Sequence, residues 1–144
     1  MEDKALLSTE EDSGAEKAEL LIVIPAYNEA ENIERVVNHL TANFPQYDYV
    51  VVNDGSRDET AAICQRNGYN LLNLPVNLGL AGAFQAGLKY ADKYGYQYAV
   101  QLDGDGQHRP EYLESMIKKM EEGYDIVIGS RFVGEKKPFT MRML

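Results

Sequence analysis

The stretch LLIVIPAYNEAENIERVVNHLTANFPQYDYVVVNDGS, residues 20–56, decides the fold. It opens with an apolar, β-branched run at residues 20–24 and closes with a similar run at residues 49–53. Between the two runs, four apolar residues recur at the spacing of one helix face: Ile33, Val36, Val37 and Leu40. A strand, a helix and a strand in this order predict a βαβ unit, which is the building block of a parallel sheet.

The same alternation continues along the chain. Further apolar runs occupy residues 70–74, 98–102 and 125–129, and a short helix is expected around residues 59–66. Two longer helices are predicted from apolar stripes: Leu80, Ala83, Phe84, Gly87, Leu88 and Ala91, and then Leu113, Met116, Ile117 and Met120. Near-continuous apolar runs are typical of strands covered on both faces. Five strands and four helices therefore predict an α/β, Rossmann-like fold, a mostly parallel sheet with helices on both faces.

Composition excludes several classes of protein. The chain has 144 residues, the size of one domain, and 44% of them are apolar, as in globular proteins. No apolar run approaches the roughly 18 residues that span a membrane. A net charge of −9 without a basic stripe argues against nucleic acid as a partner. The single cysteine, Cys64, fits a reducing compartment, so we expect a cytoplasmic protein.

Charge and motif boundaries divide the chain into three parts. Residues 1–19 are strongly acidic and have few large apolar side chains, which predicts a disordered tail. Residues 20–134 hold the predicted domain. Residues 135–144 mix Lys136 and Lys137 with apolar side chains and are expected to begin a linker or a further segment. Such a mixture also fits an approach to an anionic membrane surface.

Polar and glycine-rich segments follow every predicted strand. They read PAYNE (25–29), DGSRD (54–58), NLGLAG (77–82), DGDGQH (103–108) and SRFVG (130–134). In open parallel sheets, ligands bind outside the carboxyl ends of the strands. The topology therefore predicts a binding site built from these segments.

The DGDGQH segment carries the most chemistry. Asp103 and Asp105 alternate around Gly104, and Gln107 follows. Such oxygen ligands suit Mg²⁺ or Mn²⁺ bridging to phosphate oxygens. An EF-hand is excluded because His108 stands where that loop needs glycine. A solvated Asx-Gly turn remains the simpler alternative for this segment.

Two other segments suit a nucleoside. Tyr27 offers a flat face for a base, with Asn28 and Glu29 as polar partners, and Asp54 could accept hydrogen bonds from ribose hydroxyls or a base edge. The structural alternatives are an ordinary strand-to-helix turn for PAYNE and a helix N-cap at Asp58. Common nucleotide and hydrolase motifs are absent: there is no P-loop, no G-x-G-x-x-G after the first strand and no G-x-S-x-G elbow.

The motifs IPAYNEAENI, VVNDGSRDET, NLGLAGAFQAG, LDGDGQHRPE and VIGSRF together resemble family 2 glycosyltransferases, over about residues 20–134. The resemblance is strongest to the dolichyl-phosphate mannosyltransferase and polyprenyl-phosphate glycosyltransferase branch. It implies the GT-A fold and inverting transfer of a sugar from a UDP- or GDP-sugar to polyprenyl phosphate or a glycan. Domains of this family are generally longer. We therefore expect a truncated chain, with membrane association through the missing C-terminal part and the full-length protein at the cytoplasmic face.

The resemblance also implies roles for individual residues. The base and ribose would be bordered by Pro25, Tyr27, Glu29, Val52 and Asp54. A divalent metal, Mg²⁺ or Mn²⁺, would be held by Asp103, Asp105 and Gln107. The nucleotide sugar would also be bound by Asp103, Gly104 and Asp105, and Arg131 would contact the donor diphosphate. The catalytic residues would be Asp103, Asp105 and Arg131, which stabilise charge on the leaving nucleoside diphosphate. Asn53 departs from the frequent D-D-G-S pattern, and no carboxylate stands out as a general base.

Two alternatives from other classes stay open. The first is a non-catalytic nucleotide-sugar-binding module or an inactive fragment. The second, a sugar nucleotidyltransferase, is disfavoured because PAYNE occupies the place of the expected glycine- and arginine-rich loop.

Overall fold

The structure, a computed structural model, describes residues 19–104 and 110–125. It forms two compact units that divide after His108, and each is considered by itself. The elements of the first unit are β1 (Leu20–Ala26), α2 (Ile33–Asn43), β2 (Asp48–Asn53), α3 (Thr60–Arg66), β3 (Leu71–Asn73), α4 (Gly79–Lys93) and β4 (Tyr98–Gln101). In the second unit a 3-10 turn, Pro110–Tyr112, leads into α5 (Leu113–Glu121). The predicted acidic tail, the strand at 125–129 and the segment 135–144 lie wholly or almost wholly outside the described residues.

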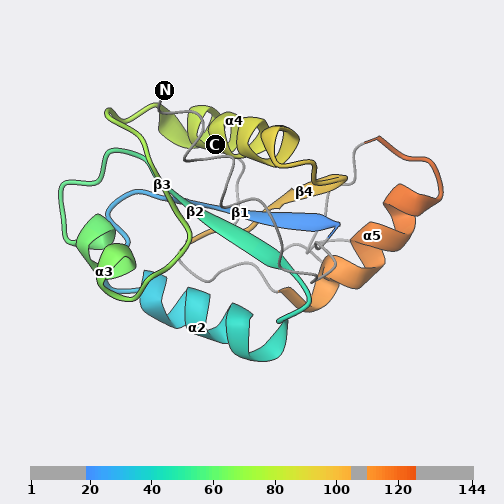
Figure 1. The fold of residues 1–144 in the computed structure, drawn as a ribbon, viewed down its shortest axis with the longest axis horizontal. Coiled ribbons are helices and arrows are strands. Elements are labelled where there is room, and N and C mark those ends of the chain that lie inside the picture. Colours follow the sequence, from blue (N-terminus) through green and yellow to red (C-terminus); the bar gives the residue numbers. More distant parts are fainter. Residues whose placement is uncertain (1–18, 105–109, 126–144) are drawn as a thin grey trace, which may run out of the picture. The chain divides into compact units, whose positions relative to one another are not determined.

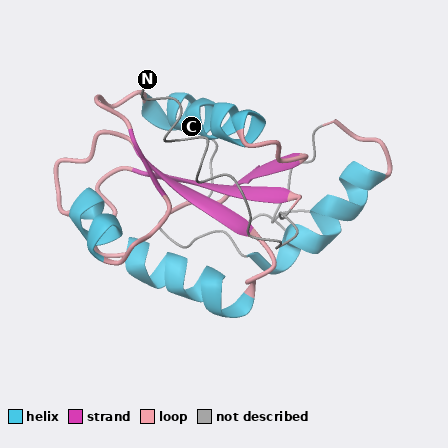
Figure 2. Ribbon diagram, in the orientation of Figure 1, coloured by secondary structure: helices cyan, strands magenta, loops and turns pink. Residues whose placement is uncertain are grey.

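The four strands form one parallel sheet in the order β3-β2-β1-β4. The central strand β1 pairs with β2 on one side and with β4 on the other, so that Val23 lies opposite both Val50 and Gln101. The sheet first grows in one direction from β1 to β3, and α4 then carries the chain back across to β4. Right-handed crossovers in opposite directions place their helices on opposite faces. Figure 1 shows α4 on one side of the sheet and α2 and α3 on the other, and Figure 2 shows the strands as the middle layer. The predicted α/β fold is confirmed.

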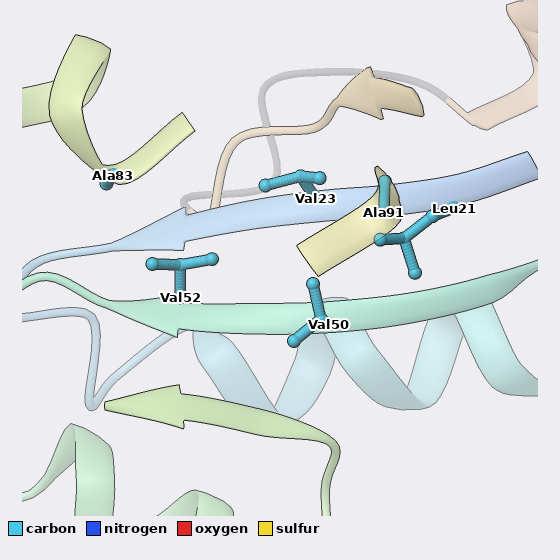
Figure 3. Packing of buried hydrophobic residues seen from close by; sticks show 6 residues of the cluster. All are labelled: Leu21, Val23, Val50, Val52, Ala83 and Ala91. Atoms are coloured by element: carbon cyan, nitrogen blue, oxygen red, sulfur yellow. The ribbon is translucent and has the colours of Figure 1, made fainter. Parts of the chain in front are cut away.

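The core lies on both faces of β1 and β2. One cluster joins the α4 side of the sheet to the helix (Figure 3), and its buried members are Leu21, Val23, Val50, Val52, Ala83 and Ala91. Because alternate residues of a strand point to opposite faces, Ile22, Ile24 and Val51 face the other layer. The apolar stripe predicted for α2 is buried along its whole length, from Ile33 to Leu40.

The stripe predicted for α4 is correct only in part. Ala83, Gly87 and Ala91 are buried, but Leu80 and Leu88 are 58% and 41% exposed. The buried residues follow an i, i+4, i+8 row of small side chains, which lets the helix lie close to the sheet. A Cβ placed on Gly87 would overlap the methyl groups of Val23, so this row has no room for leucine. Sequence spacing alone could not show that the row of small residues, and not the neighbouring leucines, faces the sheet.

In the part of the chain that the structure describes, no helix is long and apolar enough to cross a bilayer.

Candidate functional site

The carboxyl ends of β1, β2 and β4 bring three sequence-predicted segments to one edge of the sheet. The strand order reverses between β1 and β4, and such a switch point is where open α/β sheets bind ligands. The segment after β4 lies directly against the end of β1: a Cβ placed on Gly104 would be 3.1 Å from the Pro25 carbonyl oxygen and 3.5 Å from Glu29 Cγ. The structure thus places Gly104, directly after Asp103, beside the PAYNE segment.

Asp103 is half-buried at this edge. Its Oδ1 accepts a hydrogen bond of 3.2 Å from the Nε2 group of Gln101, the last residue of β4. A carboxylate oxygen is the kind of donor that Mg²⁺ and Mn²⁺ prefer. Asp105, Gln107 and Arg131 lie outside the described residues. Within those residues, no cluster of three or more His, Cys, Asp or Glu side chains could hold a metal ion.

Asp54 lies where β2 ends, and its side chain is almost fully buried, at 3% exposure. One carboxylate oxygen, Oδ1, accepts a short hydrogen bond of 2.6 Å from the Leu78 N–H, directly before α4. Asn77 Nδ2 in turn donates to the Asp54 carbonyl oxygen at 3.1 Å. The carboxylate predicted to face a nucleobase therefore also fixes the segment that precedes α4. This hydrogen bond joins residues 24 positions apart, and the only sequence signal for it is the turn-forming triplet Asn-Leu-Gly.

Two other predicted residues have buried side chains. Val52 belongs to the core cluster and Pro25 is buried in β1, so that each could border a ligand mainly through its backbone. The neighbouring Asn53 donates from Nδ2 to Asn73 Oδ1 at 3.0 Å and accepts the Ser56 N–H at 3.2 Å. An aspartate lacks the amide donor, so it could keep the contact with Asn73 only by accepting from a rotated Asn73 amide.

Tyr27 and Glu29 leave the end of β1 on either side of Asn28. Tyr27 is 45% exposed, so that its ring can serve as a stacking surface for a ligand. Glu29 is half-buried, and its Oε2 accepts a hydrogen bond of 3.1 Å from Asn32 Nδ2 at the start of α2. The loop after β1 thus carries an exposed aromatic residue, Tyr27, and a carboxylate, Glu29, whose Cγ lies near Gly104.

The loop after β1 is tied to the loop after β2 by a set of hydrogen bonds that we call the loop latch, formed by residues 28–30 and 56–60. Its acceptors from the second loop are Ser56, Asp58 and Thr60. The N-cap of α3 is Glu59, one residue after the predicted Asp58, but the Asp58 carboxylate accepts the Thr60 N–H at 2.9 Å where the helix begins. Sequence reasoning missed the bonds between the two loops.

The latch makes stability depend on the charge of Asp58. Partial burial alone would raise the pKa of this carboxyl, but hydrogen bonds from Thr60 and from the Ala30 N–H outweigh it, so that the pKa lies below its usual value. A lowered pKa adds stability above the unfolded-state value of 3.8, and this stability is lost as the pH falls through the folded-state pKa.

We therefore expect the urea midpoint of the wild-type chain to fall more steeply between about pH 5 and pH 2 than that of Asp58→Asn, whose side chain does not titrate. Parallel slopes for the two proteins would contradict the stabilising role of the charged Asp58.

Comparison with known proteins places the chain in a family. The profile of Glycosyl transferase family 2 matches residues 21–144. Polyprenol monophosphomannose synthase of Mycolicibacterium smegmatis is 34% identical over 119 residues, which cover 78% of this chain and 45% of that protein. Undecaprenyl-phosphate mannosyltransferase of Micrococcus luteus is 34% identical over 119 residues, which cover 79% and 49%. The chain spans about half the length of these relatives.

A solved structure has a similar fold. The mannosyltransferase PcManGT from Pyrobaculum calidifontis, in complex with GDP-Man and Mn²⁺, aligns with a TM-score of 0.58 at 20% identity. The alignment covers 80% of this chain and 37% of that one. The resemblance to the polyprenyl-phosphate branch and the GT-A fold is confirmed. This chain belongs to glycosyltransferase family 2.

Proposed function

We propose that this chain is the donor-binding part of an enzyme that transfers a hexose from a nucleotide diphosphate to a polyprenyl phosphate, with inversion at the anomeric carbon. The observation that carries the proposal is the close approach of Gly104 to the Pro25 carbonyl and to Glu29. It brings the segment that carries Asp103 beside the segment that carries Tyr27 and Glu29, which supports a site for a nucleotide and its phosphates at this switch point. The names of two relatives favour mannose as the sugar.

Each side chain has a role that its chemistry supports. The exposed ring of Tyr27 would stack on the base, and Glu29 and Asp54 would border the ribose and the base edge. Asp103 would hold a divalent cation together with Asp105 and Gln107, and its carboxylate at the carboxyl end of β4 fits that task. The bound ion would neutralise charge that develops on the diphosphate leaving group. Arg131, a planar cation, would bind the diphosphate oxygens in a bidentate manner.

The proposed acceptor explains why no general base is needed from this chain. A sugar hydroxyl must lose a proton as it attacks, and a side chain has to accept that proton. A polyprenyl phosphate is already anionic near neutral pH and attacks directly. We place the reaction at the cytoplasmic face of a membrane, because the acceptor is a lipid and the free, buried Cys64 fits a reducing compartment.

The test is a calorimetric titration of the chain with GDP, UDP, GDP-mannose and UDP-glucose, each with Mn²⁺ and again with EDTA. We expect one of the two nucleotides to bind, and EDTA to weaken its binding. Transfer of labelled sugar to a short polyprenyl phosphate is then measured with the nucleotide sugar that binds. Binding without transfer would fit both a donor-binding part and a non-catalytic nucleotide-sugar-binding module, and no binding to the folded chain would contradict the proposal.

A further inference from the structure

We infer that Asn28, Ser56, Asp58 and Thr60 are positioning residues for the donor site, which hold the loop after β1 in the conformation that presents Tyr27 and Glu29 to a nucleotide. The inference rests on the proposed function and extends it to residues of the loop latch that touch no ligand in the proposal.

Three successive N–H groups of the first loop all reach side chains of the second. Asn28 N–H donates to Ser56 Oγ at 3.0 Å, and Glu29 N–H donates to Thr60 Oγ1 at 2.9 Å. Ala30 N–H donates to Asp58 Oδ2 at 3.1 Å. The backbone on both sides of Glu29 is therefore fixed by residues about thirty positions further along the chain.

Asn28 completes the latch in the opposite direction. Its Oδ1 accepts the N–H groups of Arg57, at 2.9 Å, and Asp58, at 3.4 Å. Its φ of 54° is left-handed, and no other non-glycine residue that the structure describes has a positive φ. Asparagine tolerates this region better than most residues, but few side chains adopt it without local hydrogen bonds. Asn28 thus supplies both the turn and the acceptor that holds it.

Thr60 links the two halves of the latch. It is fully buried, and its hydroxyl donates to Asp58 Oδ1 while it accepts the Glu29 N–H. Because a hydroxyl has a single hydrogen, donation to Asp58 leaves its lone pairs for Glu29. Valine at position 60 would keep the shape of the side chain and leave the Glu29 N–H without its partner.

The latch affects binding because it holds the backbone next to Tyr27 and Glu29. Tyr27 and Glu29 flank the left-handed Asn28, so that a return of Asn28 to an ordinary φ would turn both side chains away from their present directions. Glu29 Cγ also lies 3.5 Å from where a Cβ on Gly104 would stand, so that the loop after β1 packs against the segment after β4. A loosened latch would therefore disturb base stacking and the edge next to Asp103 together.

The experiment compares the affinity of Thr60→Val and Thr60→Ser for GDP and UDP with Mn²⁺, at a temperature where circular dichroism shows every protein to be folded. We expect Thr60→Val to bind the preferred nucleotide about tenfold more weakly, since the half-buried Glu29 N–H loses its partner. Thr60→Ser keeps the hydroxyl and should bind within about twofold of the wild type. Thr41→Val is the matched control, because the Thr41 hydroxyl donates only to carbonyls of its own helix, those of Val37 and Asn38.

A second measurement separates positioning from a general loss of stability. If the latch acts through Tyr27, then Thr60→Val should weaken binding much less in a Tyr27→Ala background than in the wild type. Equal nucleotide affinity of Thr60→Val and wild type, or an undiminished effect in the Tyr27→Ala background, would overturn the inference. A folded wild-type chain that binds neither nucleotide would instead overturn the proposed function on which the inference rests.

Discussion

Replacement of Asp103 with alanine is expected to abolish the metal-dependent part of nucleotide-sugar binding. The affinity of the variant in Mn²⁺ should fall to the value measured in EDTA, and sugar transfer should slow by about two decades or more. The reason is that Asp103 is the carboxylate at the switch point that the proposal assigns to the metal, and its Oδ1 is oriented by Gln101 at 3.2 Å. Calorimetry with and without chelator measures the first effect, and single-turnover transfer measures the second.

Two further variants make the Asp103 result interpretable. Asp103→Asn keeps an acceptor for Gln101 but removes the charge, so it should resemble Asp103→Ala in metal dependence while preserving the local hydrogen bond. Asp92→Ala removes an exposed carboxylate from α4 and should bind nucleotide as the wild type does. Retention of metal-dependent affinity by Asp103→Ala would show that Asp103 does not hold the metal.

Gly55→Ala is expected to cause the largest loss of stability, about 2–5 kcal/mol in the free energy of unfolding. Gly55 has a φ of 67°, which disfavours any side chain, and a Cβ there would lie 2.6 Å from Asn77 N and 2.8 Å from the Val76 carbonyl carbon. Both atoms are backbone, and they belong to the segment that Asp54 holds through the Leu78 N–H. That segment cannot move aside without breaking the short hydrogen bond. Urea unfolding followed by circular dichroism measures the loss.

Gly68→Ala is the matched control for Gly55→Ala. Gly68 has the same φ of 67°, but a Cβ there would meet nothing within 4 Å. Gly68→Ala should therefore lose only the free energy needed to hold a residue other than glycine at a left-handed φ, about 1–2 kcal/mol. If Gly55→Ala lost no more free energy of unfolding than Gly68→Ala, the close packing of Gly55, after β2, against Val76 and Asn77, after β3, would be refuted.

The parallel sheet and the α2 face could be predicted from sequence because their signals are local. The runs at residues 20–24 and 49–53 are almost purely apolar, and the α2 stripe repeats at the period of a helix. The strand order was not predicted, since it depends on which way each crossover turns. The outward-facing Leu80 and Leu88 were missed because hydrophobicity ranks leucine above glycine, whereas the close approach of α4 to Val23 selects the small residue at position 87.

The sequence predicted which segments gather at one edge of the sheet, but not the hydrogen bonds that join them. Polar segments after strands identify the edge of a parallel sheet, and the structure brings Asp103, Gly104 and Glu29 to that edge. The loop latch and the bond from Asp54 to Leu78 join residues 24 to 31 positions apart. Ser56, Asp58 and Thr60 read locally as turn and cap residues, and nothing in their own neighbourhood shows that Asn28, Glu29 and Ala30 are their partners.

The most direct test of a donor site at the switch point is a heteronuclear NMR titration of the labelled chain with GDP-mannose and UDP-glucose in Mg²⁺. We expect one of the two to shift the backbone amide signals of Tyr27, Glu29, Asp54 and Gly104, all at the carboxyl edge of the sheet. Amides at the opposite edge, such as that of Asp48, whose carboxylate accepts a hydrogen bond from Tyr96, should keep their positions. Shifts confined to the Asp48 and Tyr96 edge, or no shift with either nucleotide sugar, would contradict a donor site at the switch point.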